Sequence, residues 1–454
     1  MDAQTSRLPA DLSHAPHDVK LWLVDLIKAR SYKSLKALRG VNKEWKALVD
    51  PHLWSHIRLE PKPIEDLERF ILDCVVHIGP HVRSVSIQQW SKTTNFQPSG
   101  ERDAPYVVQD RIPAIEKVLG LPARGTRWPL GTWDERIAIV QNALLARALA
   151  SCTGLERLSV TGSLDIVTHE NSGGFDIKMT VDHQRVPNRV FPALQSIGKS
   201  IIELDLKMGT EYGDAHPVGH MRRFVALAPN CRHLSLHLRG KVAKRWNDHN
   251  RPELMRAIGT LKQLETLSTG GWTIWDKILE NHRTLFPSTL RSLVVDNGTI
   301  SVRSINTLAK HYGGHLVSLE LSWLNNSLFP DVASQPFHFP KLKSLVLRAA
   351  FSAPFLRAFA GSPLEHVELF GKLSNLLSMG SRPHACRPVR ASGLQPDDMT
   401  VAVILDFLKE HKSSLKKVKV YDKLLIDPPA AQLAILQWCG TNDIEAELDH
   451  TPYL

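Results

Sequence analysis

A short pattern of aliphatic positions recurs along the chain. An aliphatic residue is followed by two variable residues, a second aliphatic, one variable residue and a third aliphatic. Nine copies begin at Leu155, Ile201, Cys231, Leu264, Leu290, Leu316, Leu342, Leu364 and Leu415, and a possible tenth begins at Val82. Copies at 264, 290, 316 and 342 are 26 residues apart, so the pattern predicts a repeat protein.

Each copy predicts one short strand. Its last two aliphatic residues alternate with variable ones, as they do in a strand with one buried face. Apolar residues at helical spacing predict returning helices in the stretches that start at Met221, Pro252 and Val302. A strand and a helix cannot bury their apolar faces alone, so stacked units share a core and a parallel sheet. The predicted fold class is α/β, a solenoid or horseshoe with a concave sheet.

Departures from the repeat indicate where other segments lie. Thr269 stands at the third aliphatic position of its copy, and long intervals require inserts near 161–192 and 371–398, which are rich in Gly, Pro, Ser and polar residues and predict loops. Helices are expected over Ile137–Leu149 and from Asp427 onward, whereas 87–133 carries no assignable pattern. The expected domains are a small all-α module over 8–60, a linker or irregular first repeats over 61–144, the solenoid over 145–426 and a C-terminal cap over 427–454.

The N-terminal module carries apolar residues at helical spacing over 16–59, which predicts three short helices. Its stretch LKALRGVNKEWKALVDPHLW, which starts at Leu35, resembles the F-box, with Leu35, Leu38, Val41 and Trp45 at that family's apolar positions. The family's opening Leu-Pro is matched either by Leu8-Pro9 or by Ala15-Pro16. ALASCTGLERLSV and ALAPNCRHLSL likewise resemble the cysteine-containing leucine-rich repeats of F-box proteins.

The resemblance implies that the module binds the Skp-type adaptor of a cullin-based ubiquitin ligase. The residues that it places at this contact are Pro16, Val19, Leu23, Leu35, Leu38 and Val41. An alternative is that these residues only pack the helices together, and Trp45 in particular is expected inside the module. The helices then serve as a cap on the open end of the solenoid.

The variable residues between the buried aliphatics are expected on the concave sheet, where they form a candidate target-binding surface. The candidates are Arg157, Glu203, Asp205, His233, His237, Glu320, Arg348, His366, Glu368, Phe370, Lys417, Lys419 and Tyr421. Their mixed charge favours a protein or peptide as the target. A surface that binds nucleic acid is typically a uniformly basic track with stacking aromatic residues. The basic end near Lys417 points weakly the other way.

Composition and charge limit the cellular locations and the kinds of binding partner that we expect. The 454 residues carry a net charge of +10, and two basic stretches, 239–251 and 382–390, are expected to be solvated loops. No apolar run approaches the roughly 18 residues that a membrane span requires, so a cytoplasmic or nuclear protein is expected. Five scattered cysteines without a C-x-x-C pair predict buried thiols and neither disulfides nor a zinc module.

No pattern of an enzyme is present. The sequence lacks H-E-x-x-H, a glycine-rich phosphate loop and G-x-S-x-G. His233 and His237 share a strand face, but four strand residues span about 13 Å, too far for both to ligate one metal. No catalytic residue, metal or cofactor is expected. Three functions stay open: a ubiquitin-ligase substrate receptor, a non-catalytic scaffold with a helical cap, and a basic nucleic-acid-associated repeat protein.

Overall fold

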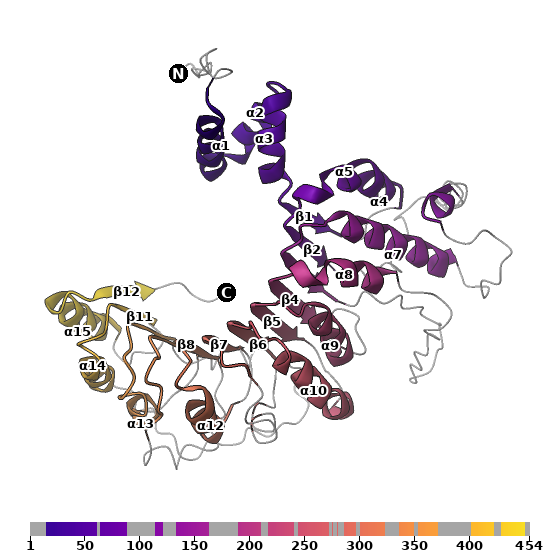
Figure 1. Cartoon of the computed structure of the whole chain (residues 1–454). Helices are drawn as coiled ribbons and strands as arrows, with labels where there is room; N and C mark the ends of the chain where they lie inside the picture. Colours follow the sequence, from indigo (N-terminus) through magenta and orange to yellow (C-terminus); the bar gives the residue numbers. More distant parts are fainter. Residues whose placement is uncertain are drawn as a thin grey trace. The chain divides into compact units, whose positions relative to one another are not determined.

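The computed structural model describes residues 15–60, 64–88, 114–120, 133–162, 189–209, 217–239, 244–271, 275, 279, 286–296, 300–322, 336–348, 353–370, 401–421 and 428–449. The chain divides into two compact units, Met1–Glu203 with Tyr212–Asp214, and Leu204–Glu211 with Ala215–Leu454. Within each unit the order of the strands in the sheet is their order in the sequence (Figure 1).

The first unit begins with three helices, α1 (His17–Arg30), α2 (Tyr32–Arg39) and α3 (Lys43–Leu53), as predicted. Polar side chains start two of them: Ser31 Oγ accepts the Ser34 N–H at 3.2 Å, and Asn42 Oδ1 accepts the Trp45 N–H at 2.9 Å. The helices share a core that consists of Val24, Leu35, Leu38, Trp45, Leu48, Val49 and Leu53. Trp45 thus lies inside the module, as expected.

Ion pairs tie the three helices together. The Lys20 ammonium is almost fully buried, lies 2.6 Å from Glu44 Oε1 and sits 6.0 Å from the centre of the Trp45 ring. Arg39 pairs with Asp50 and so links α2 to α3. A buried ammonium requires such partners because its desolvation is costly.

Strands of the first unit alternate with helices, as repeats require. In chain order they are β1 (His56–Leu59), α4 (Ile64–Arg69), a π-helical turn (Phe70–Val75), α5 (Val76–Ile78), a 3-10 turn (Gly79–His81), β2 (Ser84–Gln88), α7 (Trp133–Ser151), β3 (Arg157–Thr161), α8 (Val190–Ile197), a second 3-10 turn (Gly198–Ser200) and the start of β4 (Glu203–Met208). Strands β1, β2 and β3 pair in parallel. The possible copy at Val82 is therefore a true strand, and α7 confirms the helix that leads into the copy at Leu155.

The second unit continues the repeat. Its elements after β4 are α9 (Pro217–Leu227), β5 (His233–Leu238), α10 (Lys244–Gly259), β6 (Thr266–Gly270), β7 (Ser292–Asp296), α12 (Val302–Tyr312), β8 (Ser318–Ser322), β9 (Ser344–Arg348), α13 (Ala353–Arg357), β10 (His366–Leu369), α14 (Val401–Glu410), β11 (Lys417–Tyr421), α15 (Pro428–Thr441) and β12 (Glu445–Asp449). From β5 to β12 each strand pairs in parallel with the next. All nine predicted copies are strands, and the architecture is leucine-rich-repeat-like.

One hydrogen-bond arrangement repeats where the strands begin. A carbonyl just before one strand accepts two successive N–H groups of the next, as Arg291 O does from Val317 and Ser318 at 2.7 and 3.0 Å. The register then places Leu293 beside Leu319 and Leu319 beside Leu345, all fully buried. Helices α9, α10, α12, α13 and α14 lie on one side of these strands (Figure 1). The alternating residues on the opposite side form what we call the open face.

Thr269 interrupts the aliphatic row and is still buried, at 1% exposure. Its Oγ1 lies 3.4 Å from the Val294 carbonyl oxygen, which accepts its hydrogen bond. The hydroxyl is therefore satisfied within the sheet, and the strand keeps its register despite the polar residue.

Among the described residues the cysteines are free thiols, and Cys152, Cys231 and Cys439 are buried, as predicted, while Cys74 is partly buried. Burial raises the pKa of the Cys152 thiol to about 12 and that of Cys439 to about 11. Such thiols are not ionised at neutral pH, and they pack as small apolar groups.

Two strands were missed by the sequence pattern. In β1, Ile57 pairs with Val85 and Leu59 with Ile87, so Trp54 takes the first aliphatic position of this repeat. In β12, Ala446 stands opposite Val418, and Asp443, with a φ of 55°, stands at the first position. These two strands do not match the aliphatic pattern because Trp54, Ala446 and Asp443 stand at positions where the other copies have aliphatic residues. The repeats thus start within 8–60 and continue into 427–454, where α15 confirms the predicted helix.

The structure corrects one expected loop. The basic stretch 239–251 was expected to be a solvated loop, but α10 begins at Lys244 and carries Pro252 inside it, so residues 244–251 are helical. The stretch 382–390 and nearly all of the inserts 161–192 and 371–398 lie outside the described residues, as does most of 87–133.

We predict that the aromatic core before β10 is a major source of stability. Phe337 packs against the rings of Phe359 and Phe355, at centroid distances of 4.9 and 5.7 Å, and is 2% exposed. Phe337→Ala leaves a cavity and lowers the free energy of unfolding by about 3–5 kcal/mol, measured by urea unfolding. Leu433→Ala, at a residue that is 57% exposed, is the control and changes it by less than about 0.5 kcal/mol. Equal effects of the two substitutions contradict this assignment.

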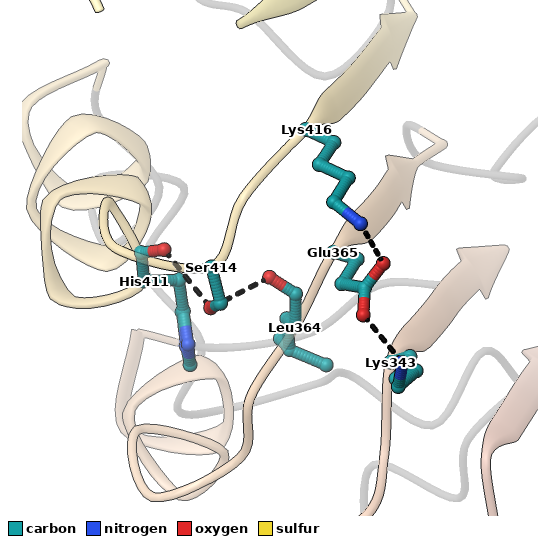
Figure 2. Close-up of polar contacts among 6 residues, drawn as sticks. All are labelled: Lys343, Leu364, Glu365, His411, Ser414 and Lys416. Carbon is teal, nitrogen blue, oxygen red and sulfur yellow. Dashed lines mark hydrogen bonds and ion pairs between the residues drawn. The ribbon is translucent and has the colours of Figure 1, made fainter.

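Glu365 sits between two lysines at the start of neighbouring strands (Figure 2). Lys343 Nζ lies 2.7 Å from one carboxylate oxygen and Lys416 Nζ 2.6 Å from the other. Hydrogen bonds from Lys343 and Lys416 lower the pKa of Glu365 from its ordinary 4.5 to about 2. As the pH falls, the Glu365 carboxylate is therefore protonated at a higher pH in the unfolded chain than in the folded chain. The two ion pairs of Glu365 stabilise the fold fully above about pH 4.5.

We predict that this stabilisation is lost as the pH falls from about 4.5 to about 2. Glu365→Gln removes that part of the pH dependence, so its thermal midpoint falls less than that of the unsubstituted chain between pH 5 and pH 3. Glu410→Gln, at an exposed glutamate of α14, is the matched control and leaves the slope unchanged. A Glu365→Gln slope equal to that of the unsubstituted chain rules out the effect.

Candidate protein-interaction surfaces

The first unit exposes an apolar stripe on α1. Val19 is 44% exposed and Trp22 is 64% exposed, and Leu26, one further turn along, is partly exposed. Residues at this spacing lie on one side of a helix. Val41, between α2 and α3, is also 58% exposed. Large apolar side chains left in water on a small module are typical of an interface.

The structure divides the residues that the resemblance placed at the adaptor contact. Pro16, Val19 and Val41 are exposed, and Leu23 is partly buried against the core. Leu35 and Leu38 are 1% and 3% exposed and pack inside the module, so the folded module does not offer their side chains to a partner. Trp22 was missed, although its position three residues after Val19 was a usable signal.

The open face of the second unit carries an ion pair stacked on an aromatic ring. Arg348 Nε on β9 lies 2.6 Å from Glu320 Oε1 on β8, and its guanidinium carbon lies 4.3 Å from the centre of the Phe370 ring. Arg348 is therefore held between a carboxylate and a π-face, both of which stabilise its charge. These residues, which the sequence analysis proposed separately, lie together across three strands.

Phe370 and Tyr421 have little surface left for a target. Their rings stack with centroids 3.7 Å apart, and with Val346 they form a small cluster in which they are 5% and 8% exposed. Their role on this face is therefore packing. They hold Arg348 and the neighbouring strands in place.

Strand β12 neutralises the basic end that the sequence showed. Lys417 and Lys419 lie 2.8 Å from carboxylate oxygens of Glu445 and Glu447. The hydrogen bonds that Lys417 and Lys419 donate to these carboxylates raise the pKa of both lysines above its ordinary value. The partners were not anticipated because β12 was not recognised as a strand. A basic track for nucleic acid is therefore absent from the described part of this end of the face.

His233 and His237 lie in different environments on the open face. His233 Nδ1 lies 3.2 Å from Thr266 Oγ1, and its side chain is exposed. His237 leans over β6, where a Cβ on Gly270 would come within 2.1 Å of its Nδ1. Burial lowers the pKa of His237, although Asp205 and Asp296 act in the opposite direction. His237 is therefore neutral at physiological pH.

The remaining candidates are divided between the units. Arg157 and Glu203 belong to the first unit and are exposed, whereas His366 and Glu368 are exposed and partly exposed on β10. The described open face of the second unit carries the carboxylates of Asp205, Asp296, Glu320, Glu368, Glu445 and Glu447 and the cations of Lys207, Arg348, Lys417 and Lys419. Six negative and four positive charges make this face acidic on a chain of net charge +10.

Within the described residues, no group of three or more His, Cys, Asp or Glu side chains is arranged to hold a metal ion. None of the described helices combines the length and apolar character that crossing a membrane requires.

Comparison with known proteins gives no family. No family model and no curated protein matches the sequence. Among solved structures, the chain is similar to one from the complex of Rad7 and Elc1 in yeast, at 13% identity over 82% of this chain and 90% of that one, with a TM-score of 0.31. It is also similar to an internalin (InlF) from Listeria monocytogenes, at 11% identity over 76% and 95%, with a TM-score of 0.28. At such scores neither likeness carries an argument.

We predict that Gly270 is required for the position of His237. Gly270→Ala places a methyl group against the imidazole and lowers the free energy of unfolding by about 1–3 kcal/mol, measured by urea unfolding. In a His237→Ala background the same substitution costs much less, because the clash is gone. Gly219→Ala, with open space around its Cβ, is the control. An equal cost of Gly270→Ala in both backgrounds excludes the imidazole as its cause.

Proposed function

We propose that this chain is a non-catalytic substrate receptor of a Skp-cullin-F-box type ubiquitin ligase. Its N-terminal helices dock a Skp-type adaptor, and the open face of the repeats binds a protein target for ubiquitin-dependent degradation. The other ligase subunits supply the chemistry, and the receptor acts in the cytoplasm or nucleus.

The observation that carries the proposal is the exposed apolar stripe of α1. Val19 and Trp22 are exposed and Leu26 is partly exposed, and none of the three belongs to the buried core of the module. The module also resembles the F-box over Leu35–Trp54. An apolar helix face of this kind is a common means of docking a partner protein.

A target-binding role for the repeats is supported by their open face. Side chains of both charges, serines and histidines lie between the buried leucines on successive strands. Such a surface binds a folded protein or a peptide by complementary polar contacts. The net negative charge of the described face of the second unit disfavours nucleic acid.

The structure changes which substitution tests adaptor docking. Leu38→Asp would place a charge in the core of the module and unfold it, so its effect would not be informative. Trp22→Asp and Val41→Asp change exposed residues and preserve the fold.

We predict that Trp22→Asp weakens adaptor recovery at least about tenfold, because exposed tryptophans often carry much of the binding energy of an interface. The measurement is copurification of the tagged chain with a Skp-type adaptor from cells. Leu433→Asp, at an exposed leucine of α15, is the matched control and leaves recovery unchanged. Circular dichroism checks that every variant is folded.

Failure to recover the adaptor with the unsubstituted chain rejects the ligase role. Recovery that Trp22→Asp and Val41→Asp leave intact rejects docking through α1. The alternative function is a repeat scaffold whose helices only cap the solenoid. It predicts no adaptor with any variant and loss of folding when residues 15–55 are removed.

A further inference from the structure

We propose that the open face between β7 and β9 binds a lysine or arginine side chain of the protein target, with Asp296 as the ion-pair partner and Ser322 Oγ as a hydrogen-bond acceptor. This inference rests on the proposed role of the open face as the target-binding surface. It names the chemistry that the target presents there.

Small residues lie near this region on the open face. Gly270, Ser292 and Ser318 occupy open-face positions on three successive strands, and the register places Gly270 beside Asp296 and Ser292 beside Ser318. Ser292 and Ser318 lie four strand residues, about 13 Å, before Asp296 and Ser322, so the room that they leave is at the start of the strands, where the stem of a long side chain can lie. The imidazole of His237 covers Gly270. Val294, partly exposed on the same strand as Asp296, offers an apolar surface to the methylene stem of a lysine or arginine.

Carboxylates outnumber cations among the residues of this region that the structure describes. Asp296, Glu320 and Glu368 lie on β7, β8 and β10. The cation between them is Arg348, which pairs with Glu320. Burial raises the pKa of Glu320, and Asp296 and Glu368 add to this while Arg348 opposes it. The carboxylates thus repel one another, and an added cation relieves that repulsion.

Asp296 is the carboxylate best placed for an incoming cation. No described residue forms an ion pair with its side chain, and His237, which interacts electrostatically with Asp296, is neutral. Arg348 is held by Glu320 and Phe370 and is not free to turn toward Asp296.

Ser322 supplies an independent observation. Its side chain is 3% exposed, and its Oγ has no hydrogen-bond partner. It lies at an open-face position beside Arg348 and one strand from Asp296. A buried hydroxyl without a partner costs free energy, so a donor that reaches it gains a bond that the free protein does not make. An ammonium or guanidinium carries several such donors.

The bounds of the region fit one side chain better than a large group. His237 stands over Gly270 on one side, and Arg348 with Phe370 stands on the other. A nucleic acid would bring phosphates toward three carboxylates, which is unfavourable. The occupant is therefore a basic residue of a polypeptide.

The test uses the full chain and a fluorescent hexa-arginine peptide, with hexa-glutamate as the reversed-charge probe. We predict that hexa-arginine binds by fluorescence anisotropy in low salt, although the chain is itself net positive. Asp296→Asn weakens this binding about tenfold or more, as the loss of a charged hydrogen bond requires. Ser322→Ala weakens it several-fold.

Glu445→Gln is the matched control. It also removes one carboxylate from the open face, but Glu445 lies on β12 and pairs with Lys417. Its affinity for hexa-arginine stays within about twofold of that of the unsubstituted chain. Thermal unfolding checks that Asp296→Asn and Ser322→Ala remain folded.

Three results overturn the inference. They are no binding of hexa-arginine, equal losses for Asp296→Asn and Glu445→Gln, which indicate general electrostatic attraction, and stronger binding of hexa-glutamate. None of these measurements involves the adaptor or α1. Loss of adaptor recovery therefore rejects the ligase role, and loss of Asp296-dependent peptide binding rejects this site.

Discussion

Each unit depends on one interaction, the parallel pairing of its strands with the strands of the next repeat. A single carbonyl just before a strand accepts two N–H groups from its neighbour, as Arg291 does from Val317 and Ser318. This fixes the register, and the register stacks the leucines into continuous buried rows. No repeat has a complete core alone, so stability comes from neighbours. Thr269 is tolerated because its hydroxyl finds a carbonyl within the same ladder.

The same register arranges the surface that a partner meets. Alternation places every second strand residue on the open face, and pairing brings Glu320 beside Val346 and Ser322 beside Arg348. Side chains about 26 residues apart in sequence thereby become neighbours. The face is not a uniform row of contact residues, since Phe370 and Tyr421 stack on each other and immobilise Arg348. Between β7 and β9, Asp296 and Ser322 remain able to form polar contacts with a partner.

Repetition also explains why both ends of the array were hard to recognise. An end repeat has a neighbour on one side alone, so its sequence meets different demands. At β1, Trp54 replaces the first aliphatic residue, and at β12 Asp443 and Ala446 replace two. Strand β12 carries Glu445 and Glu447, which neutralise the lysines of β11. In the helical module, too, the sequence pattern does not distinguish buried from exposed positions. Leu38 and Val41 both fit the helical spacing, but Leu38 is buried and Val41 is exposed.

The sequence by itself determined the repeat, nine of the ten described strands between β1 and β12, the three N-terminal helices and the identity of the open-face residues. These follow from periodicities of two and 3.6 residues, which are local properties of strands and helices. Only the tertiary structure decided which apolar residues of the module stay in water, that Lys417 and Lys419 are neutralised, and that Arg348 is held by Glu320 and Phe370. Each of these depends on contacts between distant parts of the chain, where the register and the neighbouring side chains set burial and charge.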